Sequence, residues 1–319
     1  MEEDSEREAR STMRILFFGT SEFAVEPLRA LIEAKFDIAG VVTTPDKPGK
    51  RGKKLIEPPV KVLAKEYSLD IFQPEKLKDD SAYQAIKDFE ADIFVVVSYG
   101  KFLPNNILSL PKFRINIHPS LLPKYRGPSP INYALLNGDS YTGVSIIDVS
   151  DKMDAGDVYM QWVEKINQKD NYETLHNRLS LIGSKMVVCA VCGIENGDIK
   201  PKKQDESLAT YTKIIDKKDG EINFEEMTAE EIVNMVKAYY GWPSAYFKYK
   251  SKVFKIFEAE VVDVNEKPSS IVKVSKKELV IACKKGAISI KKIQPESKKP
   301  MEIKAFLAGY RFEVGEIIK

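Results

Sequence analysis

The segment RILFFGTSEFAVEPLRALIEAKFDIAGVVT, residues 14–43, decides the fold of this chain. It begins with an apolar run at residues 14–18, and a short turn at residues 19–21 follows. A helical pattern of apolar residues then extends over about residues 23–34, and a second apolar run occupies residues 38–43. A strand, a turn, a helix and a second strand in this order predict a βαβ unit with parallel strands.

The same alternation continues beyond this unit, as far as about residue 199. The run DIFVVVS at residues 92–98 is strongly β-branched, which is typical of a central strand that is buried on both faces. The alternation predicts a doubly wound α/β domain with a parallel sheet over residues 13–199. Further strands are expected at 71–72, 115–118 and 144–149, and further helices at 60–67, 82–89 and 172–196.

The remainder of the chain changes character. Residues 200–212 are polar and lack periodicity, so they are the best candidate for a linker. A helical pattern at 229–240 precedes several short alternating segments, which predict a small β-barrel within a second domain at 213–319. These strands are expected at 245–249, 253–262, 271–274, 279–283 and 287–290.

The composition is ordinary for a soluble protein, with 43% hydrophobic and 30% charged residues and a formal net charge of +2. Any nucleic-acid surface must therefore be a local patch. Residues 248–311 hold 16 Lys and Arg against 7 Asp and Glu. That surplus suits binding of nucleic acid, and it suits a solubilising surface equally well.

The cellular setting follows from what the sequence lacks. No run approaches the roughly 18 consecutive apolar residues of a membrane span. Residues 1–12 are acidic and have no apolar core, so we expect a disordered extension and no secretory signal. Three cysteines do not make a disulfide framework. We therefore expect a cytoplasmic protein without a membrane partner.

The segment RINIHPSLLPKYRG, residues 114–127, is the strongest candidate for chemistry. Side chains alternate along a strand, so Asn116 and His118 are expected on one face. Pro119 ends the strand and opens an apolar loop at its carboxyl end, where open α/β sheets bind ligands. An amide can hold a developing oxyanion while an imidazole moves protons, so the pair favours carbonyl chemistry. An isolated Asn-x-His is more often structural.

Two charged loops accompany this strand. Residues 148–157 are rich in carboxylates and glycine, and a carboxylate beside an imidazole can orient it. By itself this segment is more often a solvated acidic turn. Residues 45–54 interleave five basic residues with glycines, which suits contacts to a phosphate backbone. A flexible charged loop is the usual alternative.

Other features point away from some functions. The turn at residues 18–23 has one glycine where a dinucleotide fold carries three, which disfavours a nicotinamide dehydrogenase. Cys189 and Cys192 lie in a predicted helix without a second pair, so core packing is expected in place of zinc or redox chemistry. His176 lies on the same helical pattern and is interpreted as structural.

Together these segments resemble the methionyl-tRNA formyltransferase family, from about Met13 to the C-terminus. NIHPSLLPKYRG and MDAGD are shared with the wider folate-dependent formyltransferases, whereas the basic loop and the C-terminal segments narrow the resemblance to the tRNA enzyme. Gly49-Lys50 and Tyr240-Gly241 depart from the common pattern outside the proposed chemistry. The other matching pieces are FFGTSEFA, PDKPGKRGKKL, VVSYGKFLP, TGVSI, WPSAY, QPESKKP and FLAGYR.

The resemblance implies a Rossmann-like catalytic domain and a smaller OB-like β-barrel domain. It implies transfer of the formyl group of 10-formyltetrahydrofolate to the α-amine of methionyl initiator tRNA, without a metal, by a protein that is expected to be a monomer. By match to the family motif the catalytic residues are Asn116, His118 and Asp154. The motif places the folate site at Ser120, Leu121, Leu122 and Pro123. The expected tRNA contacts are Lys50, Arg51, Lys53 and Lys54.

Two alternatives stay open at this point. A formyltransferase that acts on a small amine, such as a nucleotide-sugar or a purine intermediate, would need neither the basic loop nor the barrel. A non-catalytic RNA-binding protein would need neither Asn116 nor His118 nor Asp154, and the presence of all three disfavours it.

Overall fold

The computed structural model of the protein describes residues 12–49 and 55–318. The basic side chains expected to contact tRNA, at Lys50, Arg51, Lys53 and Lys54, lie outside the described residues, as do residues 1–11 of the expected extension. By its internal contacts the chain divides into two compact units. The first comprises Met1–Gly127, Thr142–Glu164 and His176–Tyr211, and the second comprises Pro128–Tyr141, Lys165–Leu175 and Thr212–Lys319.

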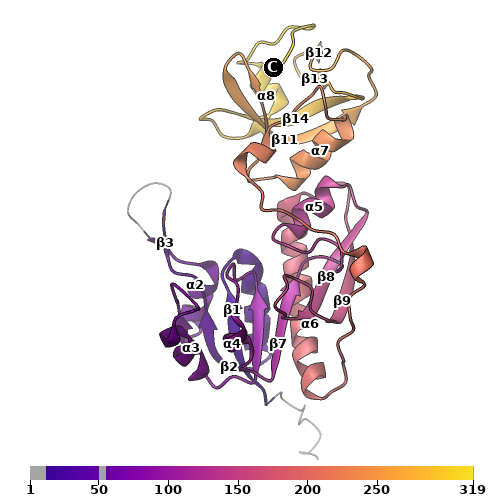
Figure 1. The fold of residues 1–319 in the computed structure, drawn as a ribbon. Helices are drawn as coiled ribbons and strands as arrows, with labels where there is room; N and C mark the ends of the chain where they lie inside the picture. Colours follow the sequence, from indigo (N-terminus) through magenta and orange to yellow (C-terminus); the bar gives the residue numbers. More distant parts are fainter. Residues whose placement is uncertain (1–11, 50–54, 319) are drawn as a thin grey trace, which may run out of the picture. The chain divides into compact units, whose positions relative to one another are not determined.

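The first unit is built on a seven-stranded sheet with the order β5-β2-β1-β6-β7-β8-β9 (Figure 1). The five strands from β5 to β7 are parallel, as the alternation of strands and helices predicted. The strands are β1 (Arg14–Gly19), β2 (Asp37–Val42), β5 (Ile71–Phe72), β6 (Ile93–Val97), β7 (Phe113–His118), β8 (Tyr141–Asp148) and β9 (Val158–Lys165).

The sheet is mixed, which corrects the expectation of a parallel sheet throughout. β8 pairs with β7 in the antiparallel direction, and His118 at the end of β7 lies opposite Ser145 in β8. A parallel pairing would require a crossover that carries the chain back to the other end of the sheet. Here the chain re-enters the sheet at the end where β7 stops, without such a crossover. The interior of β8 is buried on both faces, so its apolar sequence reads the same in either direction.

Helices cover both faces of this sheet. On one face α3 and α4 contribute Ile86 and Ile107 to a buried cluster with Phe18 and Val96. The long helix α6 packs against β7, because a Cβ on Gly183 would come within 3.0 Å of the Ile117 side chain. The helices are η1 (Glu22–Ala24), α1 (Val25–Glu33), α2 (Pro59–Glu66), α3 (Asp80–Lys87), α4 (Asn105–Leu108), α6 (Tyr172–Glu195) and η2 (Glu206–Leu208).

By length and composition α6 could cross a membrane, and it is the one helix of the described residues that passes this test. Half of its most apolar window is buried inside the protein, as in a core helix.

The basic loop begins and ends in a short antiparallel hairpin, β3 (Lys47–Pro48) with β4 (Leu55–Ile56). Lys61 on α2 ties the two ends of this hairpin together, with its Nζ 2.7 Å from Asp46 Oδ2 and 3.2 Å from Glu57 Oε1. Hydrogen bonds from Gln73 and Lys61 lower the pKa of Asp46. The base of the loop is therefore fixed by charged side chains within the first unit.

The second unit carries an antiparallel sheet with the order β10-β11-β14-β13-β12, and β15 pairs with β14. Irregularities in the register around Glu258 bend the long strand β11, and the sheet curls into a half-barrel. The predicted short strands are confirmed. They are β10 (Ala245–Tyr249), β11 (Lys252–Val262), β12 (Ile271–Val274), β13 (Leu279–Ala282) and β14 (Ala287–Pro295). The short strand β15 (Met301–Glu302) was not predicted.

An aromatic core fills the half-barrel, where Phe254 contacts the rings of Phe247, Phe306 and Phe312. The expected helix at 229–240 is confirmed as α7 (Ala229–Ala238), which begins with a capping box between Thr228 and Glu231. The other helices of this unit are α5 (Pro130–Leu136), η3 (Lys217–Gly220) and α8 (Ile303–Leu307).

Candidate active site

Asn116 and His118 project from the carboxyl-terminal part of β7 and meet at one carboxylate. Nδ2 of Asn116 lies 3.5 Å from Oδ1 of Asp154, and Nδ1 of His118 lies 3.5 Å from the same oxygen. Both side chains therefore lie on one face of the strand, as the alternation predicted. The three residues that the family motif selected come together in space.

Asp154 is held in place from several directions. Its side chain is 13% exposed, and its Oδ2 accepts a hydrogen bond of 2.8 Å from the backbone N–H of Gly127. Its backbone is left-handed, with φ of 53°, a conformation that costs free energy in a residue with a Cβ. Two residues later, a Cβ on Gly156 would lie 1.7 Å from the carbonyl oxygen of Asp148. The loop is thus folded tightly against the end of β8.

The side chain of His118 is only 6% exposed, and each of its ring nitrogens faces an oxygen. Nε2 lies 2.9 Å from the carbonyl oxygen of Tyr125. A carbonyl oxygen can only accept, so we assign the hydrogen to Nε2. Nδ1 then faces the carboxylate of Asp154 and is the nitrogen that remains for exchange of a proton. Tyr125 presents its carbonyl from a left-handed backbone, with φ of 63°.

The four residues of the expected folate site form a braced loop directly behind His118. Ser120 is buried, and its hydroxyl donates to the carbonyl of Lys124 at 2.6 Å. The backbone N–H of Leu122 donates to the Ser145 hydroxyl, and its side chain points into the protein. Leu121 and Pro123 are half-buried, so they present the accessible apolar surface of this loop.

Arg126 and Gln204 also belong to the surroundings of the site, although no sequence pattern marks either residue for a role. Arg126 is buried, and Gln204 donates to the backbone of the Asp154 loop. From sequence, an arginine beside a candidate site is readily interpreted as a ligand-binding residue. No sequence pattern distinguishes a buried arginine from an exposed one. Gln204 lies in the polar segment interpreted as a linker, where no periodicity marks a contact.

Metal ligands do not gather in the part of the chain that the structure describes: no group of three or more His, Cys, Asp or Glu side chains is placed to hold an ion. Cys189 is exposed and Cys192 is half-buried, so the expectation of core packing was wrong for Cys189. Cys283 is buried in the second unit, where burial raises the pKa of its thiol to about 12.

Two family models match the chain. The model described as formyl transferase matches residues 13–191, and the model described as formyl transferase, C-terminal domain, matches residues 214–311. Among curated proteins, the methionyl-tRNA formyltransferase of Sulfurihydrogenibium sp. is 40% identical over 309 residues, which is 95% of this chain and 99% of that protein. The methionyl-tRNA formyltransferase of Thermodesulfovibrio yellowstonii is 42% identical and covers 94% of this chain and 97% of its own.

Solved structures of lower identity share the fold. HypX from Aquifex aeolicus in complex with tetrahydrofolic acid has a TM-score of 0.62 at 18% identity, and the match covers 94% of this chain and 47% of HypX. An N-formyltransferase from Helicobacter canadensis in complex with folinic acid and dTDP-3-aminofucose has a TM-score of 0.66 at 18% identity, and the match covers 89% of this chain and 99% of that protein. At this identity the likeness concerns the fold alone.

Proposed function

This chain belongs to the methionyl-tRNA formyltransferase family, and from that premise we propose that it transfers the formyl group of 10-formyltetrahydrofolate to the α-amine of methionyl initiator tRNA. The observation that carries the proposed chemistry is the convergence of Asn116 and His118 on one oxygen of Asp154. The product, N-formylmethionyl-tRNA, serves the initiation of translation.

Asn116 is the proposed donor to the oxyanion. When an amine adds to a formyl carbon, negative charge develops on the carbonyl oxygen. Asn116 has two amide hydrogens, and one of them points to Asp154. The second is left for the reacting oxygen, while the contact with Asp154 keeps the amide in one orientation. A donor of this kind contributes about 2.7–4 kcal/mol to lowering the barrier.

His118 is the proposed proton carrier. The methionyl amine attacks in its neutral form, so a proton must leave the attacking nitrogen and another must reach the departing folate nitrogen. With Nε2 engaged by Tyr125, these transfers use Nδ1 of His118. Asp154 Oδ1, 3.5 Å from Nδ1, stabilises the imidazole when it carries the additional proton. The amine is itself a sufficient nucleophile, so the proposal includes neither a covalent enzyme intermediate nor a metal.

The loop behind His118 is the proposed folate-binding edge. Leu121 and Pro123 offer accessible apolar surface, whereas Ser120 and Leu122 shape the loop through internal contacts. This division fits an apolar ring system placed next to His118. The family resemblance and the tetrahydrofolic acid bound by HypX support the assignment.

The tRNA is proposed to meet two basic surfaces. Lys50, Arg51, Lys53 and Lys54 would hold the acceptor end, on a loop whose base is tied by Lys61. The half-barrel is proposed to be OB-like and to contact the phosphate backbone through its surplus of basic residues. The domains are proposed at 13–199 and 213–319 with a linker at 200–212, in a cytoplasmic monomer that needs no membrane.

One assay tests the function against its alternatives. The protein is incubated with 10-formyltetrahydrofolate and, in parallel, with methionyl initiator tRNA, free methionine or a nucleotide-linked amino sugar. We expect formylation of the charged tRNA alone. Transfer to the amino sugar with no transfer to tRNA supports the small-amine alternative, and binding of tRNA without any formylation supports the non-catalytic one.

A further inference from the structure

The segment that follows α6 contacts the loop behind His118 directly. The backbone N–H of Arg126 donates to the carbonyl of Thr210 at 2.8 Å, and the N–H of Thr210 donates to the carbonyl of Pro123 at 3.1 Å. The Thr210 hydroxyl accepts from the N–H of Tyr125 at 2.8 Å. Thr210 therefore fastens this segment to the loop behind His118.

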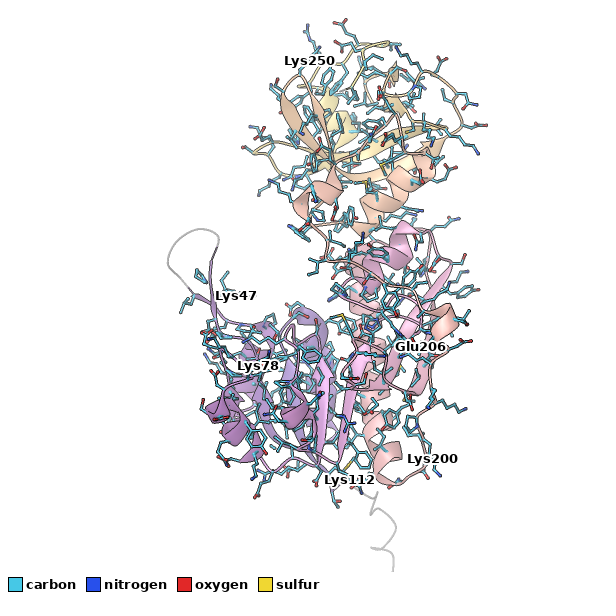
Figure 2. The ribbon with its side chains drawn as sticks, in the orientation of Figure 1. Lys47, Lys78, Lys112, Lys200, Glu206 and Lys250 are labelled. Atoms are coloured by element: carbon cyan, nitrogen blue, oxygen red, sulfur yellow. The ribbon has the colours of Figure 1, made fainter. Side chains whose placement is uncertain are left out.

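The guanidinium of Arg126 is buried next to this segment. Its side chain is 2% exposed, and Nη1 and Nη2 donate to the two carboxylate oxygens of Glu206 at 2.9 and 2.7 Å. Glu206, labelled in Figure 2, is 68% exposed, so the arginine shields one side of an ion pair that opens to solvent on the other. The hydrogen bonds from Arg126 lower the pKa of Glu206, and the pair stays charged near neutral pH.

Arg126 also decides the orientation of the Gln204 amide. Nε and Nη2 of Arg126 donate to Oε1 of Gln204 at 3.1 and 2.8 Å. A guanidinium only donates, so the amide oxygen must face it and Nε2 must face the opposite way. Nε2 donates to the carbonyl oxygens of Asp154 and Gly156 at 2.8 and 2.7 Å. Both amide hydrogens of Gln204 are thus used on the loop that carries Asp154.

This loop needs support. A left-handed backbone at a residue with a Cβ, such as Asp154, costs on the order of 1–3 kcal/mol. It persists only when the surroundings impose it. One hydrogen bond from Gln204 holds the backbone carbonyl of Asp154 itself, and the other holds the carbonyl of Gly156 two residues later. The Asp154 carboxylate is left for its contacts with Asn116 and His118.

We propose that Arg126 and Gln204 are positioning residues, which hold the backbone of the Asp154 loop so that its carboxylate faces Asn116 and His118. The proposal rests on the function proposed above. Neither residue touches a reacting atom. Arg126 sets the amide of Gln204, and that amide holds the loop.

The substitution Gln204→Glu tests this step, because it changes little in volume. The oxygen that binds Arg126 is retained, while the two donated hydrogens are replaced by an oxygen that repels the carbonyls of Asp154 and Gly156. We expect kcat to fall about tenfold or more, a part of the 10²–10⁴-fold that acid–base catalysis contributes. We expect KM for methionyl-tRNA and for 10-formyltetrahydrofolate to stay within about twofold, since no substrate contact changes.

Glu206→Gln is the matched control. It removes a negative charge beside the same guanidinium, where Gln204→Glu adds one, and it leaves the amide of Gln204 in place. We expect kcat within about twofold of the wild type, because a glutamine keeps an acceptor oxygen for Arg126 and the hydrogen bonds from Gln204 to the Asp154 loop do not change.

The two histidines allow the loop to be observed directly in solution. We expect the ring resonances of His118 to shift in Gln204→Glu and to stay unchanged in Glu206→Gln. His176, which packs edge-on against Phe23, serves as the internal reference for an intact fold. A variant that merely loses stability would not shift His118 while His176 stays in place.

The two proposals fail in different ways. If the wild type does not formylate methionyl-tRNA, the function is wrong. If the wild type is active, and Gln204→Glu keeps its kcat and leaves the His118 resonances unchanged, the positioning role is wrong. Equal losses of kcat in Gln204→Glu and Glu206→Gln also overturn it, because they would attribute the effect to the charge of the pair.

Discussion

Arg126 in the first unit and Lys250 in the second each bind a glutamate, and both nitrogen–oxygen distances are 2.7 Å. The Arg126 side chain is 2% exposed and also binds Gln204, whereas the Lys250 side chain is 61% exposed in the turn between β10 and β11 (Figure 2). Water and salt screen the pair at Lys250, so it contributes little to stability. Equal distances therefore accompany different roles.

The same contrast separates the end of β7 from the basic surfaces. Polar groups at Asn116, His118 and Asp154 are largely shielded and are connected by contacts that fix their orientation. The basic residues of the half-barrel lie mostly on exposed strand edges and turns. Buried and oriented groups suit the chemical step, and solvated charges suit binding of a phosphate backbone. Substitutions in the two regions should therefore change different quantities.

The largest effect is expected at Asn116. Asn116→Ala removes the proposed oxyanion donor, and we expect kcat to fall about 10²–10³-fold while KM for methionyl-tRNA changes little. The measurement is a steady-state assay at several salt concentrations. Asn105→Ala, at an exposed asparagine on α4, is the control. A loss that appears mainly in KM, or that depends on salt, would place Asn116 with the binding surfaces.

The two ion pairs should differ in their contributions to the free energy of unfolding. Arg126→Met removes both donors from the partly buried amide oxygen of Gln204, and we expect the free energy of unfolding to fall by about 1–3 kcal/mol. Lys250→Met should change it by about 0–1 kcal/mol, because both partners are hydrated when separated. Denaturant unfolding of the two variants measures the difference. Equal losses would contradict the distinction between the buried and the exposed pair.

The basic loop should act through binding and not through turnover. Arg51→Ala should raise KM for methionyl-tRNA. It should also reduce the slope of log affinity against log salt by about one unit, because the variant makes one phosphate contact fewer and so releases fewer counterions. The kcat at saturating tRNA should stay unchanged. An unchanged salt slope together with unchanged kinetics would show that the loop is merely solvated.

The smallest effect is expected at Glu316 in the half-barrel. Hydrogen bonds from Lys250 and Tyr249 lower the pKa of Glu316 to about 2, from an ordinary value of 4.5. Because the folded pKa lies below the unfolded one, this contribution to stability is complete above the unfolded pKa and is lost as the pH falls towards the folded pKa. Glu316→Gln should therefore flatten the fall in unfolding free energy between about pH 5 and pH 2.

The chain holds two tryptophans, so a Trp162→Phe background lets Trp242 report on the second unit alone during this titration. High salt should shrink the difference between the wild type and Glu316→Gln, because the Lys250 partner is exposed to solvent. Identical pH dependence of the two proteins at low salt would show that this carboxylate gains nothing from Lys250.

Local patterns predicted most of the first unit. The βαβ unit at residues 14–43 is confirmed, because its periodicity depends on near neighbours alone. The predicted parallel direction of β8 was wrong, because the sequence of a strand that is buried on both faces does not indicate its direction. The edge strand β9 escaped prediction because much of it is exposed and its polar and apolar residues do not alternate cleanly. Short elements such as α5 lack enough residues to show a period.

The site was predicted in part. The two-residue spacing of Asn116 and His118 correctly placed them on one face, since a strand dictates it. The approach of Asp154 depends on a left-handed backbone and on contacts from residues far along the chain, so only the family motif selected it. The contacts of Arg126 and Gln204 arise from tertiary packing, which leaves no local pattern.

The central claim is that His118 moves protons during formyl transfer to methionyl-tRNA while Asp154 orients it. The most direct test is the single-turnover rate of formylation by His118→Ala, with enzyme in excess over tRNA and with saturating 10-formyltetrahydrofolate. We predict a rate at least about 10²-fold below that of the wild type, with unchanged affinity for the tRNA. A single-turnover rate equal to that of the wild type would contradict the account.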